Sequence, residues 1–396
     1  MASERKYYDD SYTRRFTARV IEAGAHAGRP AVALEATYFY PESGGQEADR
    51  GRIGAAAVLD VQADDGGPVW HVLGEAAPAA GSEIEAEIDW ARRFDNMQQH
   101  TGQHILSAAF ERVLNAATVS SHLGEEKSSI EVARGDMDWN TVANLEAAAN
   151  EIVWRDLAVE RHWVDESEIG RWKLRKPPVA RGRIRIVEIP EWDLSACGGT
   201  HTQRTGEVGI IKIVRWEKVR GNLRFEFLCG GRALRDYAWR AESLLEAARR
   251  RTLSERELIA HLERAATERD DLKRQLRDVT AKILAAEARE RVGDPPRGVT
   301  EHRPTWSRED ARTFAIQCLA AGAPWVCASA GAPEPVLVAA RPRASGVDLK
   351  SLLPELLERT GGKGGGSPDF LQIAPADGAR AEAACRWISE RLLAGA

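Results

Sequence analysis

A helix is predicted around one short stretch of the chain, His100-Thr101-Gly102-Gln103-His104-Ile105-Leu106. Apolar residues recur at helical spacing through this region, which indicates a helix from about Asn96 to Asn115. Because positions i and i+4 share one face of a helix, both histidines can reach the same ion. Gly102 costs a helix interior about 1 kcal/mol relative to alanine, so a small residue is expected there for some reason other than helix stability.

A second stretch, about a hundred residues downstream, is Cys197-Gly198-Gly199-Thr200-His201. It follows a predicted strand at Arg183–Ile189 and a predicted turn at Glu191–Asp193. Paired glycines allow a tight backbone loop in which the thiolate and the imidazole converge. The two stretches together offer three imidazoles and one thiolate, a donor set suited to tetrahedral zinc.

We therefore predict one zinc site with the ligands His100, His104, Cys197 and His201. Four protein ligands leave no open position on a tetrahedral ion. A catalytic role then needs a displaceable ligand or an expanded coordination sphere, and a purely structural role is the alternative.

The regions around these stretches predict an α+β chain. Between Thr17 and Trp90, short β-prone runs alternate with glycine-rich turns, as in a small antiparallel barrel. A second helix is expected over about 141–156, and strand character returns at 183–189, 208–219 and 223–228. Helices combined with antiparallel strands indicate an α+β domain after the barrel.

A charged helical segment follows, from about Arg232 to Arg291. Thr252 and Glu255 have the spacing of a capping box. Apolar residues then alternate at spacings of three and four, the pattern of a coiled-coil seam. The seam consists of Leu258, Leu262, Ala265, Leu272, Leu276, Val279, Ile283 and Ala286, with Arg269 at one further seam position. It can pair within one chain or between two, so a homodimer through this segment or the C-terminal region is one expected assembly.

The helical segment is predicted to end at Gly293-Asp294-Pro295-Pro296, because proline cannot continue a helix. Expected strands at 325–330, 336–341 and 370–373 then alternate with helices at about 348–359 and 379–393, the pattern of a small α/β domain. Four parts are therefore predicted. They are a β-barrel domain with a glycine-rich motif at 1–92, a zinc-binding domain at 93–231, a helical coiled-coil segment at 232–293 and a C-terminal α/β domain at 298–396.

Composition narrows the class of protein. A length of 396 residues implies several domains, and a net charge of −5 argues against a uniformly basic nucleic-acid binder. No apolar run approaches the roughly 20 residues of a membrane span, and the N-terminus lacks the apolar core of a signal peptide. Five scattered cysteines do not suggest a disulfide framework. A soluble, reduced, cytoplasmic protein without membrane association is expected.

Two local segments are candidate RNA contacts. Residues 171–185 are rich in arginine and lysine and contain no acidic residue, so they form either a solvated face or a docking site for an RNA backbone. The run Gly361–Gly366 is either a flexible linker or a loop whose backbone amides approach phosphate. The candidate contacts are Arg171, Lys173, Arg175, Lys176 and Lys363.

The motifs, taken in order, resemble those of the alanyl-tRNA editing proteins, which comprise the editing domain of alanyl-tRNA synthetase and its freestanding relatives. The histidine stretch 100–106 matches the family's histidine motif, and Cys197–His201 with Thr205–Gly209 matches its cysteine motif. Residues 38–46, followed by Asp49 and Gly51, resemble the glycine-rich motif of the preceding barrel. Residues 361–369 resemble the C-terminal domain of DHHA1 type, found in these synthetases and in DHH-type phosphoesterases.

The resemblance implies that the four ligands hold zinc in a cleft that receives the aminoacylated 3′ end of tRNA. Gly44, Gly45 and Gln46 would help to shape this cleft, although Ser43 stands where many relatives have another glycine. Family members carry a substrate-facing polar residue after the histidine motif, and Ser121 is the best match here, with His122 and Thr200 as the other candidates.

The expected activity is hydrolysis of tRNA of the alanine system that carries serine, with glycine as the second candidate. An alanine-sized synthetase site rejects serine poorly, because one added hydroxyl discriminates weakly, whereas a second site that bonds the hydroxyl discriminates strongly. No segment ahead of the barrel could hold an aminoacylation core, so the chain is not expected to charge tRNA. The alternative is a non-catalytic RNA-binding protein with a structural zinc.

Overall fold

The computed structural model describes residues 2–394 except positions 65, 180, 332 and 344–346. The chain forms two compact units, Met1–Glu246 and Ala247–Ala396. Both units mix helices and strands, which confirms the α+β class. Within the described residues, no helix combines the length and the apolar composition that a membrane span requires.

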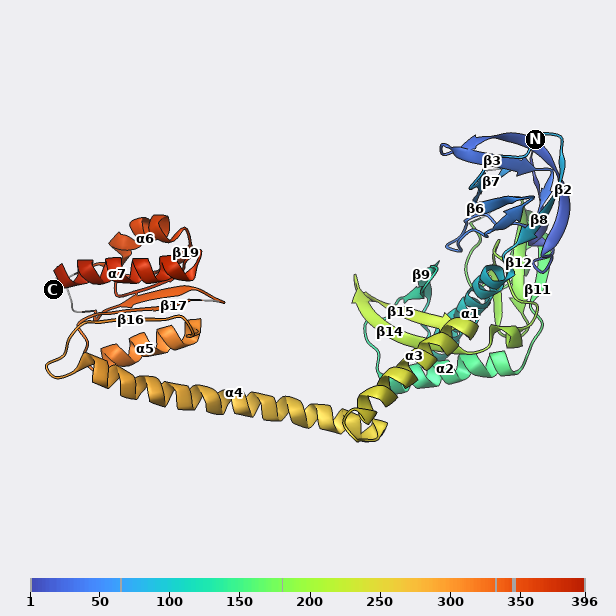
Figure 1. Ribbon diagram of the computed structural model, residues 1–396. Helices are drawn as coiled ribbons and strands as arrows, with labels where there is room; N and C mark the ends of the chain where they lie inside the picture. The colour runs from blue at the N-terminus through green and yellow to red at the C-terminus, as the bar shows by residue number, and fades with distance from the viewer. Residues whose placement is uncertain (1, 65, 180, 332, 344–346, 395–396) are drawn as a thin grey trace. The chain divides into compact units, whose positions relative to one another are not determined.

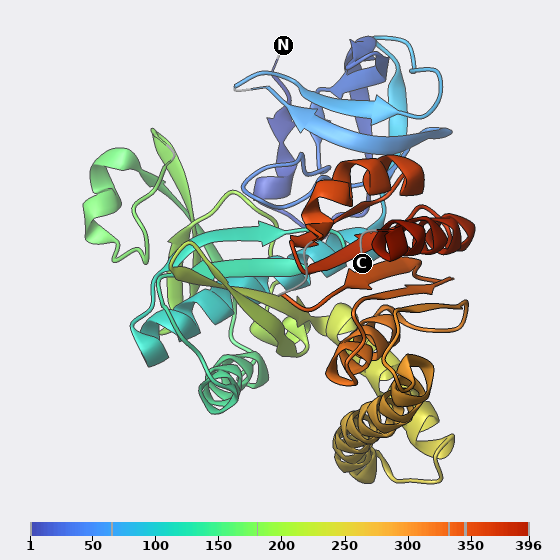
Figure 2. The same ribbon diagram turned by 90° about the vertical axis from the view of Figure 1, so that its left-hand side faces the viewer.

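Six antiparallel strands close into a barrel at the start of the first unit, as predicted from the sequence (Figure 2). Around the barrel they follow the order β2-β3-β7-β6-β5-β8. Their bounds are β2 Arg15–His26, β3 Arg29–Leu34, β5 Gly51–Ile53, β6 Ala56–Ala63, β7 Val69–Leu73 and β8 Glu83–Ile88, and the short strands β1 Glu4–Arg5 and β4 Ala36–Thr37 pair in parallel beside them. Alternating apolar residues such as Val32, Leu34 and Val61 fill the interior.

A helix and a four-stranded antiparallel sheet follow the barrel (Figure 1). The sheet has the order β14-β15-β10-β9. The elements are helices α1 Trp90–Leu114 and α2 Trp139–Trp154 and strands β9 Thr118–Leu123, β10 Ser128–Val132, β14 Ile211–Val219 and β15 Asn222–Cys229. Helix α1 packs Leu106 and Phe110 against Ile130 and Phe225 of the sheet, so the histidine stretch lies on a rigid, buried helix.

The ends of α1 differ from the predicted ones for local reasons. The helix begins six residues earlier than Asn96, because the Asp89 carboxylate caps it by accepting from the Arg92 amide. It ends where Asn115 adopts a left-handed conformation with φ of 49°. Helix α2 likewise starts early, because Asp138 caps it at Thr141.

A three-stranded antiparallel sheet carries the cysteine motif. Its order is β11-β12-β13, with bounds Glu160–Asp165, Arg183–Ile189 and Asp193–Ala196, and the short 3-10 helices η1 Lys6–Tyr8, η2 Glu166–Arg171 and η3 Thr205–Val208 lie in neighbouring loops. The predicted turn at Glu191–Asp193 is wrong in part, since Asp193 already begins β13. The predicted strand start at Val208 is also wrong, because that residue ends η3 and β14 starts at Ile211.

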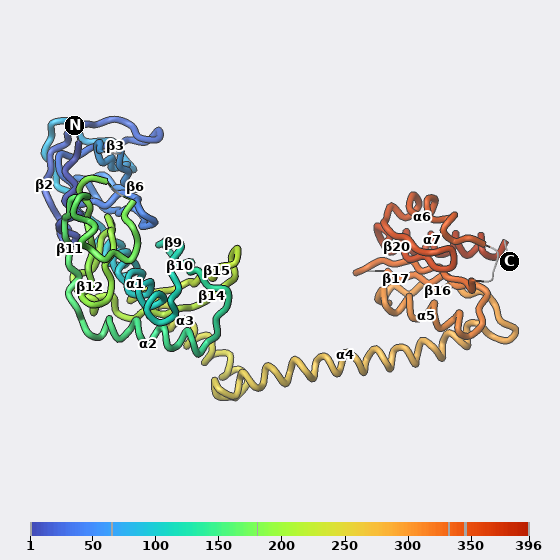
Figure 3. The backbone as a smooth tube through the Cα atoms, turned by 180° about the vertical axis from the view of Figure 1, so that it is seen from behind, coloured from blue at the N-terminus to red at the C-terminus, as the bar shows by residue number. Residues whose placement is uncertain are grey.

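The charged helical segment is two helices, α3 Gly230–Arg249 and α4 Glu255–Val292. The predicted capping box at Thr252 is wrong, because that residue has a φ of 56° and Ser254 with Glu257 forms the box instead. Figure 3 shows α4 as one uninterrupted helix. Most of the predicted seam, including Leu272 and Leu276, is exposed in the single chain.

The second unit contains a five-stranded sheet in the order β16-β17-β18-β20-β19. The elements after α4 are β16 Val299–Arg303, α5 Arg308–Ala320, β17 Val326–Ala330, β18 Val336–Ala340, η4 Leu349–Leu352, α6 Leu353–Thr360, β19 Lys363–Ser367, β20 Phe370–Ala374 and α7 Gly378–Ala394. Helix α5 covers one face of the sheet, and α6 and α7 cover the other (Figure 1). The sequence did not predict β16 and α5.

The glycine run near the C-terminus is neither a linker nor a loop over most of its length. Residues 363–367 form β19, which pairs with β20 at one end of the sheet order. A side chain at Gly364 would meet the Gln372 carbonyl oxygen at 2.4 Å, so the close strand approach requires glycine there.

Candidate metal centre

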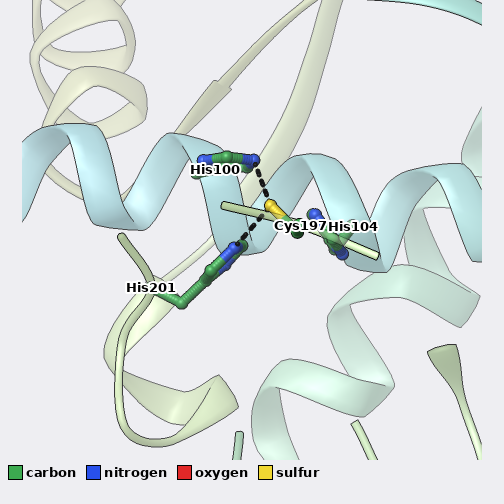
Figure 4. Close-up of side chains that lie close together, drawn as sticks. All are labelled: His100, His104, Cys197 and His201. Carbon is green, nitrogen blue, oxygen red and sulfur yellow. Dashed lines mark hydrogen bonds between the residues drawn. The ribbon is translucent and has the colours of Figure 1, made fainter. Parts of the chain in front are cut away.

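The four predicted ligands lie together in the first unit (Figure 4). His100 and His104 come from α1, Cys197 follows β13, and His201 lies in the loop after it. One ligand atom from each lies within 4.8 Å of the other three. The Cys197 Sγ is 3.4 Å from His100 Nε2 and 3.2 Å from His201 Nε2. The histidines are buried and Cys197 is partly buried, so the donors converge in a site shielded from bulk water.

Two glycines in the ligand-bearing stretches lie where a side chain would clash. A Cβ at Gly102 would lie 2.3 Å from Cys229 Sγ at the end of β15, which explains a glycine inside α1. A Cβ at Gly199 would lie 2.1 Å from the His100 ring. Gly199 therefore serves close approach to α1, whereas a Cβ at Gly198 would make only an ordinary contact of 3.6 Å with Tyr8, and neither glycine has the positive φ that a tight turn would need.

Each histidine is oriented by a polar partner on its Nδ1 atom. The Gln46 Oε1 lies 2.7 Å from His100 Nδ1, the Asp193 Oδ2 lies 2.8 Å from His104 Nδ1, and the Thr101 hydroxyl lies 3.2 Å from His201 Nδ1. A hydrogen-bond acceptor at Nδ1 keeps the ring proton on that atom. The unprotonated Nε2 then has its lone pair free to bind a metal ion. All three imidazoles thus present Nε2 to the cluster.

These partners are themselves held in place. The Gln46 amide donates to the Thr200 hydroxyl, and the Thr200 backbone amide donates to Gln46. Asp193 accepts from Arg175 Nε at 2.7 Å. The Arg185 guanidinium donates to the Cys197 and Gly199 carbonyls, so it clamps the cysteine loop. The ligand set therefore has a complete outer layer of hydrogen bonds.

The electrostatics favour a thiolate. Burial alone would raise the pKa of the Cys197 thiol, but the facing His100 and His201 hold it well below its ordinary value. Burial lowers the pKa of His104, yet the hydrogen bond to Asp193 outweighs this and raises that pKa to about 9. Burial lowers the pKa of His201 well below its usual range. Zinc prefers thiolate and imidazole donors, and because metal ligands must be deprotonated, an ion bound here would displace the proton that the raised pKa leaves on His104 at neutral pH.

A cleft of about 500 Å³ opens onto the ligands His100, His104 and Cys197. Its walls come from the barrel loop, α1, β9 with Thr118, and residues 175–179 and 183–185, and Tyr8, Tyr40 and Trp163 complete them. Ligand sites in proteins have volumes of roughly 300–1,000 Å³. The cleft is large enough for a small organic group to reach the cluster.

The predicted cleft residues occupy different positions. Gly44 and Ser121 line the cleft. The Gly45 carbonyl accepts from the Leu123 amide and so docks the barrel loop on β9. Gln46 and Thr200 lie behind His100, where they orient it. His122 is on the opposite face of β9 from Ser121, because Ser121 pairs with the core residue Ile130.

The predicted RNA contacts differ in their exposure and in their partners. Arg171 is exposed and pairs with Glu168, whereas Arg175 is mostly buried against Asp193. Lys173 is exposed, and Lys176 is exposed at the cleft, with its Nζ 3.5 Å from the Val119 carbonyl. Lys363 is exposed on β19 in the second unit.

Sequence reasoning missed Asp193, Thr101 and Arg185 as parts of this site. For Asp193 a signal existed: in an extended strand, Asp193, Ser195 and Cys197 alternate onto one side. The Ser195 hydroxyl indeed donates to Asp193.

A second group of potential ligand atoms lies on the three-stranded sheet. The carboxylates of Glu160 and Glu188 flank His162, whose Nε2 is 2.9 Å from Glu188 and 3.7 Å from Glu160. The side chains are between about a third and a half exposed. This group contains no thiolate and only one imidazole.

Comparison with known proteins places these features in context. The sequence family described as Threonyl and Alanyl tRNA synthetase second additional domain matches residues 184–225, which include Cys197 and His201. The chain is 34% identical over 387 residues to the alanyl-tRNA editing protein AlaX-L of Pyrococcus horikoshii, covering 93% of this chain and 94% of that protein.

Alanine–tRNA ligases are also similar. The ligase of Methanopyrus kandleri is 38% identical over 255 residues, which are 61% of this chain and 28% of the ligase. That of Pyrobaculum neutrophilum is 33% identical over 391 residues, which are 92% of this chain and 42% of the ligase. The chain thus spans less than half of these ligases but nearly all of AlaX-L.

Proposed function

The chain belongs to the family of alanyl-tRNA editing proteins, and on this premise we propose that it hydrolyses mischarged tRNA of the alanine system. The substrate would be tRNA carrying serine, with glycine as the second candidate. The observation that carries the proposal is the cluster of His100, His104, Cys197 and His201 at a cleft of about 500 Å³.

The donor set fits zinc. It contains one thiolate and three imidazoles whose Nε2 atoms converge, and each imidazole has an acceptor on Nδ1. When bound there, zinc would act as a Lewis acid on the ester carbonyl or lower the pKa of a water molecule.

The residues of the chain would position the ester. The partly buried Cys197 and the two α1 histidines face the cleft, so the acyl group would enter from that side. Ser121 is exposed on the cleft wall, where its hydroxyl can bond the hydroxyl of a seryl group. The Asp193 and Gln46 side chains would hold the imidazoles fixed while the acyl group binds.

For the RNA, we propose that Lys173 and Lys176 contact the tRNA backbone near the cleft and that Lys363 contributes from the second unit. Arg171 already pairs with Glu168 and would contribute less. Arg175 is proposed as a positioning residue, because its guanidinium pairs with Asp193, the partner of His104.

The remaining assignments are proposed from the sequence pattern. Residues 1–92 and 93–231 would act together in deacylation, and 232–293 and 298–396, the latter of DHHA1 type, would support tRNA binding or assembly. The exposed seam residues of α4 suggest a homodimer, which sedimentation of the full chain at several concentrations would test. A cytoplasmic location agrees with this role.

The alternative is a non-catalytic RNA-binding protein whose zinc only stabilises the fold. The observation that favours it is the number of protein donors, because four fill a tetrahedral ion. The cleft at the ligands favours the editing reaction.

Steady-state deacylation of seryl-, glycyl- and alanyl-tRNA(Ala) by the purified full chain separates the two functions. We expect serine to be removed at least about tenfold faster than alanine, since an unpaired buried polar group costs roughly 1–3 kcal/mol. Equal hydrolysis of the seryl and alanyl esters would contradict editing. No turnover in a preparation with one zinc per chain would favour the structural role.

A further inference from the structure

The outer part of the cleft has an aromatic and basic wall that the metal ligands do not use. Trp163 of β11 and Arg183 of β12 both line the cleft and are both accessible, since Trp163 is 36% exposed and Arg183 is exposed. The Arg183 guanidinium carbon lies 5.1 Å from the centre of the Trp163 ring. These two residues, the Trp163–Arg183 pair, present an aromatic surface and a positive charge to a molecule in the cleft.

The pleat of the three-stranded sheet turns both side chains to this wall. Trp163 pairs with Arg185, and Arg183 lies two residues before Arg185 on β12, so all three occupy one face of the sheet. The alternate residues Val164 and Ile184 lie on the other face, where they are buried in a small core. The sheet therefore fixes the position of the Trp163–Arg183 pair.

Contacts to the N-terminal segment orient the indole ring. The Trp163 Nε1 atom donates to the Asp9 carboxylate at 3.1 Å, and the Tyr8 ring lies at 88° to the indole with 5.7 Å between ring centres. By contrast, no carboxylate of a described residue forms an ion pair with Arg183. An ordered aromatic ring beside an unpaired guanidinium has the chemistry of a nucleotide site, where the base stacks and the phosphate meets the cation.

The Trp163–Arg183 pair lies one short step from the metal ligands. The Arg185 guanidinium donates to the Cys197 carbonyl, and the Cys197 amide donates to the Arg185 carbonyl, so Arg185 marks the ligand end of the wall. Arg183 is two residues away along β12, about 7 Å at roughly 3.3 Å per residue. In an aminoacyl-tRNA the ribose lies between the ester and the base. A base can therefore lie at this pair while the ester lies at the ligands.

We propose that the Trp163–Arg183 pair is the subsite for the 3′-terminal nucleotide of the tRNA, in which the indole stacks on the base and the guanidinium bonds the phosphate. This inference rests on the proposed function and deepens it, because it assigns a part of the substrate that the metal ligands do not bind. Charge complementarity selects this occupant over an uncharged aromatic compound, since a nucleotide carries both a ring and a phosphate.

Two matched probes isolate the contribution of the base. The first is 3′-deoxy-3′-(serylamino)adenosine 5′-monophosphate, an amide that resists hydrolysis, and the second is the same seryl ribose phosphate with a methoxy group in place of the base. Calorimetry with the full chain should show about tenfold or more tighter binding of the first probe, as for one stacked base. Trp163→Ala should bring the two affinities within about twofold of each other. Trp163→Phe should keep most of the difference, because phenylalanine also stacks.

The charge is tested separately by Arg183→Gln. This variant should weaken the binding of both probes alike, by about threefold or more, because both carry the phosphate, and it should keep the preference for the base. The matched controls are Trp154→Ala and Arg215→Gln, which change an exposed tryptophan on α2 and an exposed arginine on β14 away from the cleft. Neither control should change the affinity for either probe.

Steady-state kinetics distinguish a binding role from a structural one. Because stacking acts on the substrate and the transition state alike, Trp163→Ala should raise KM for seryl-tRNA(Ala) about tenfold and change kcat by less than about twofold. Zinc content should stay the same. A lower kcat or a loss of zinc, with KM unchanged, would show that the indole only supports the fold of the site and would overturn the inference.

The remaining outcomes separate the inference from the proposed function. Equal binding of the two probes by the unmutated chain, or an unchanged base preference in Trp163→Ala, would overturn the inference and leave the proposed function intact. If Trp163→Ala does not fold, Arg183→Gln decides: equal weakening of both probes supports the inference, and unchanged binding overturns it. A base preference that depends on Trp163, in a chain that does not deacylate seryl-tRNA(Ala), would count against the proposed function alone.

Discussion

Among its described residues, the first unit contains two groups of potential metal ligands, which are similar in how close their ligand atoms lie and different in burial and surroundings. In each group the ligand atoms lie within 4.8 Å of one another. The cluster of His100, His104, Cys197 and His201 is largely buried, whereas Glu160, His162 and Glu188 are part-exposed on a sheet surface.

The difference lies in what surrounds the ligands. In the buried cluster every histidine Nδ1 has an acceptor supplied by a different part of the chain. In the surface group the His162 Nε2 atom already hydrogen-bonds Glu188 and lies 3.7 Å from Glu160, so its potential ligand atom is occupied by the group's own members. Such a pair needs no ion to explain it. Proximity of ligand atoms is a weak criterion, and an independent outer layer of hydrogen bonds is a stronger one.

The largest effect is expected from Cys197→Ala. Loss of the only thiolate in the cluster should reduce deacylation by more than about a hundredfold and weaken zinc retention, since soft sulfur is the ligand that most favours zinc. Metal analysis of the dialysed protein, about one zinc per chain before the change, and a deacylation assay check this. Full activity in a demonstrably metal-free preparation would refute the assignment.

A smaller effect is expected from Asp193→Asn, which removes the charge facing His104 but keeps the size of the side chain. Loss of an outer-layer carboxylate typically lowers metal affinity by about 10–100-fold. Competition with a chromophoric chelator measures this. An unchanged affinity would show that the outer layer does not distinguish the two groups.

Truncation of the second unit should weaken tRNA binding more than zinc binding. Cutting the chain at Arg232, the predicted domain start, would remove a buried guanidinium that pairs with Asp95 and donates to the Gly124 carbonyl. The chain should therefore be truncated after Arg249, where α3 ends. We expect residues 1–249 to keep one zinc and to bind tRNA several-fold more weakly, as for loss of a few phosphate contacts. A folded, zinc-containing fragment that is inactive at saturating substrate would show that the second unit is part of the catalytic unit.

The smallest effect is expected from His162→Gln in the surface group. Because exposed ion pairs contribute about 0–1 kcal/mol, the free energy of unfolding should change by less than that, and zinc content should be unchanged. Loss of one equivalent of zinc would make the surface group a true site and break the contrast drawn above.

The sequence predicted the barrel, the sheet domain and the four residues of the cluster, because periodicity and short motifs are local properties. It did not predict the partners of those residues. His104 and Asp193 are 89 positions apart, and His100 and Gln46 are 54 apart, so no local pattern joins them. The glycine run was misread for a similar reason: β19 exists only because β20 pairs with it. Thr118 lies on the same face of β9 as Ser121 only because Val119 is an extra residue in the strand, and simple strand alternation does not reveal this.

Gln46 comes from the loop between β4 and the barrel strand β5, yet it accepts a hydrogen bond from the His100 ring in helix α1. The barrel is therefore not an interchangeable module. Exchanging barrels between relatives would succeed only if the incoming loop brought an acceptor to the same point and a donor to Thr200. Without these, the His100 proton could move from Nδ1 to Nε2. A chimeric protein that folds well would then still lack a metal-binding lone pair on the His100 Nε2 atom. The barrel and helix α1 must therefore be exchanged together if the site is to remain intact.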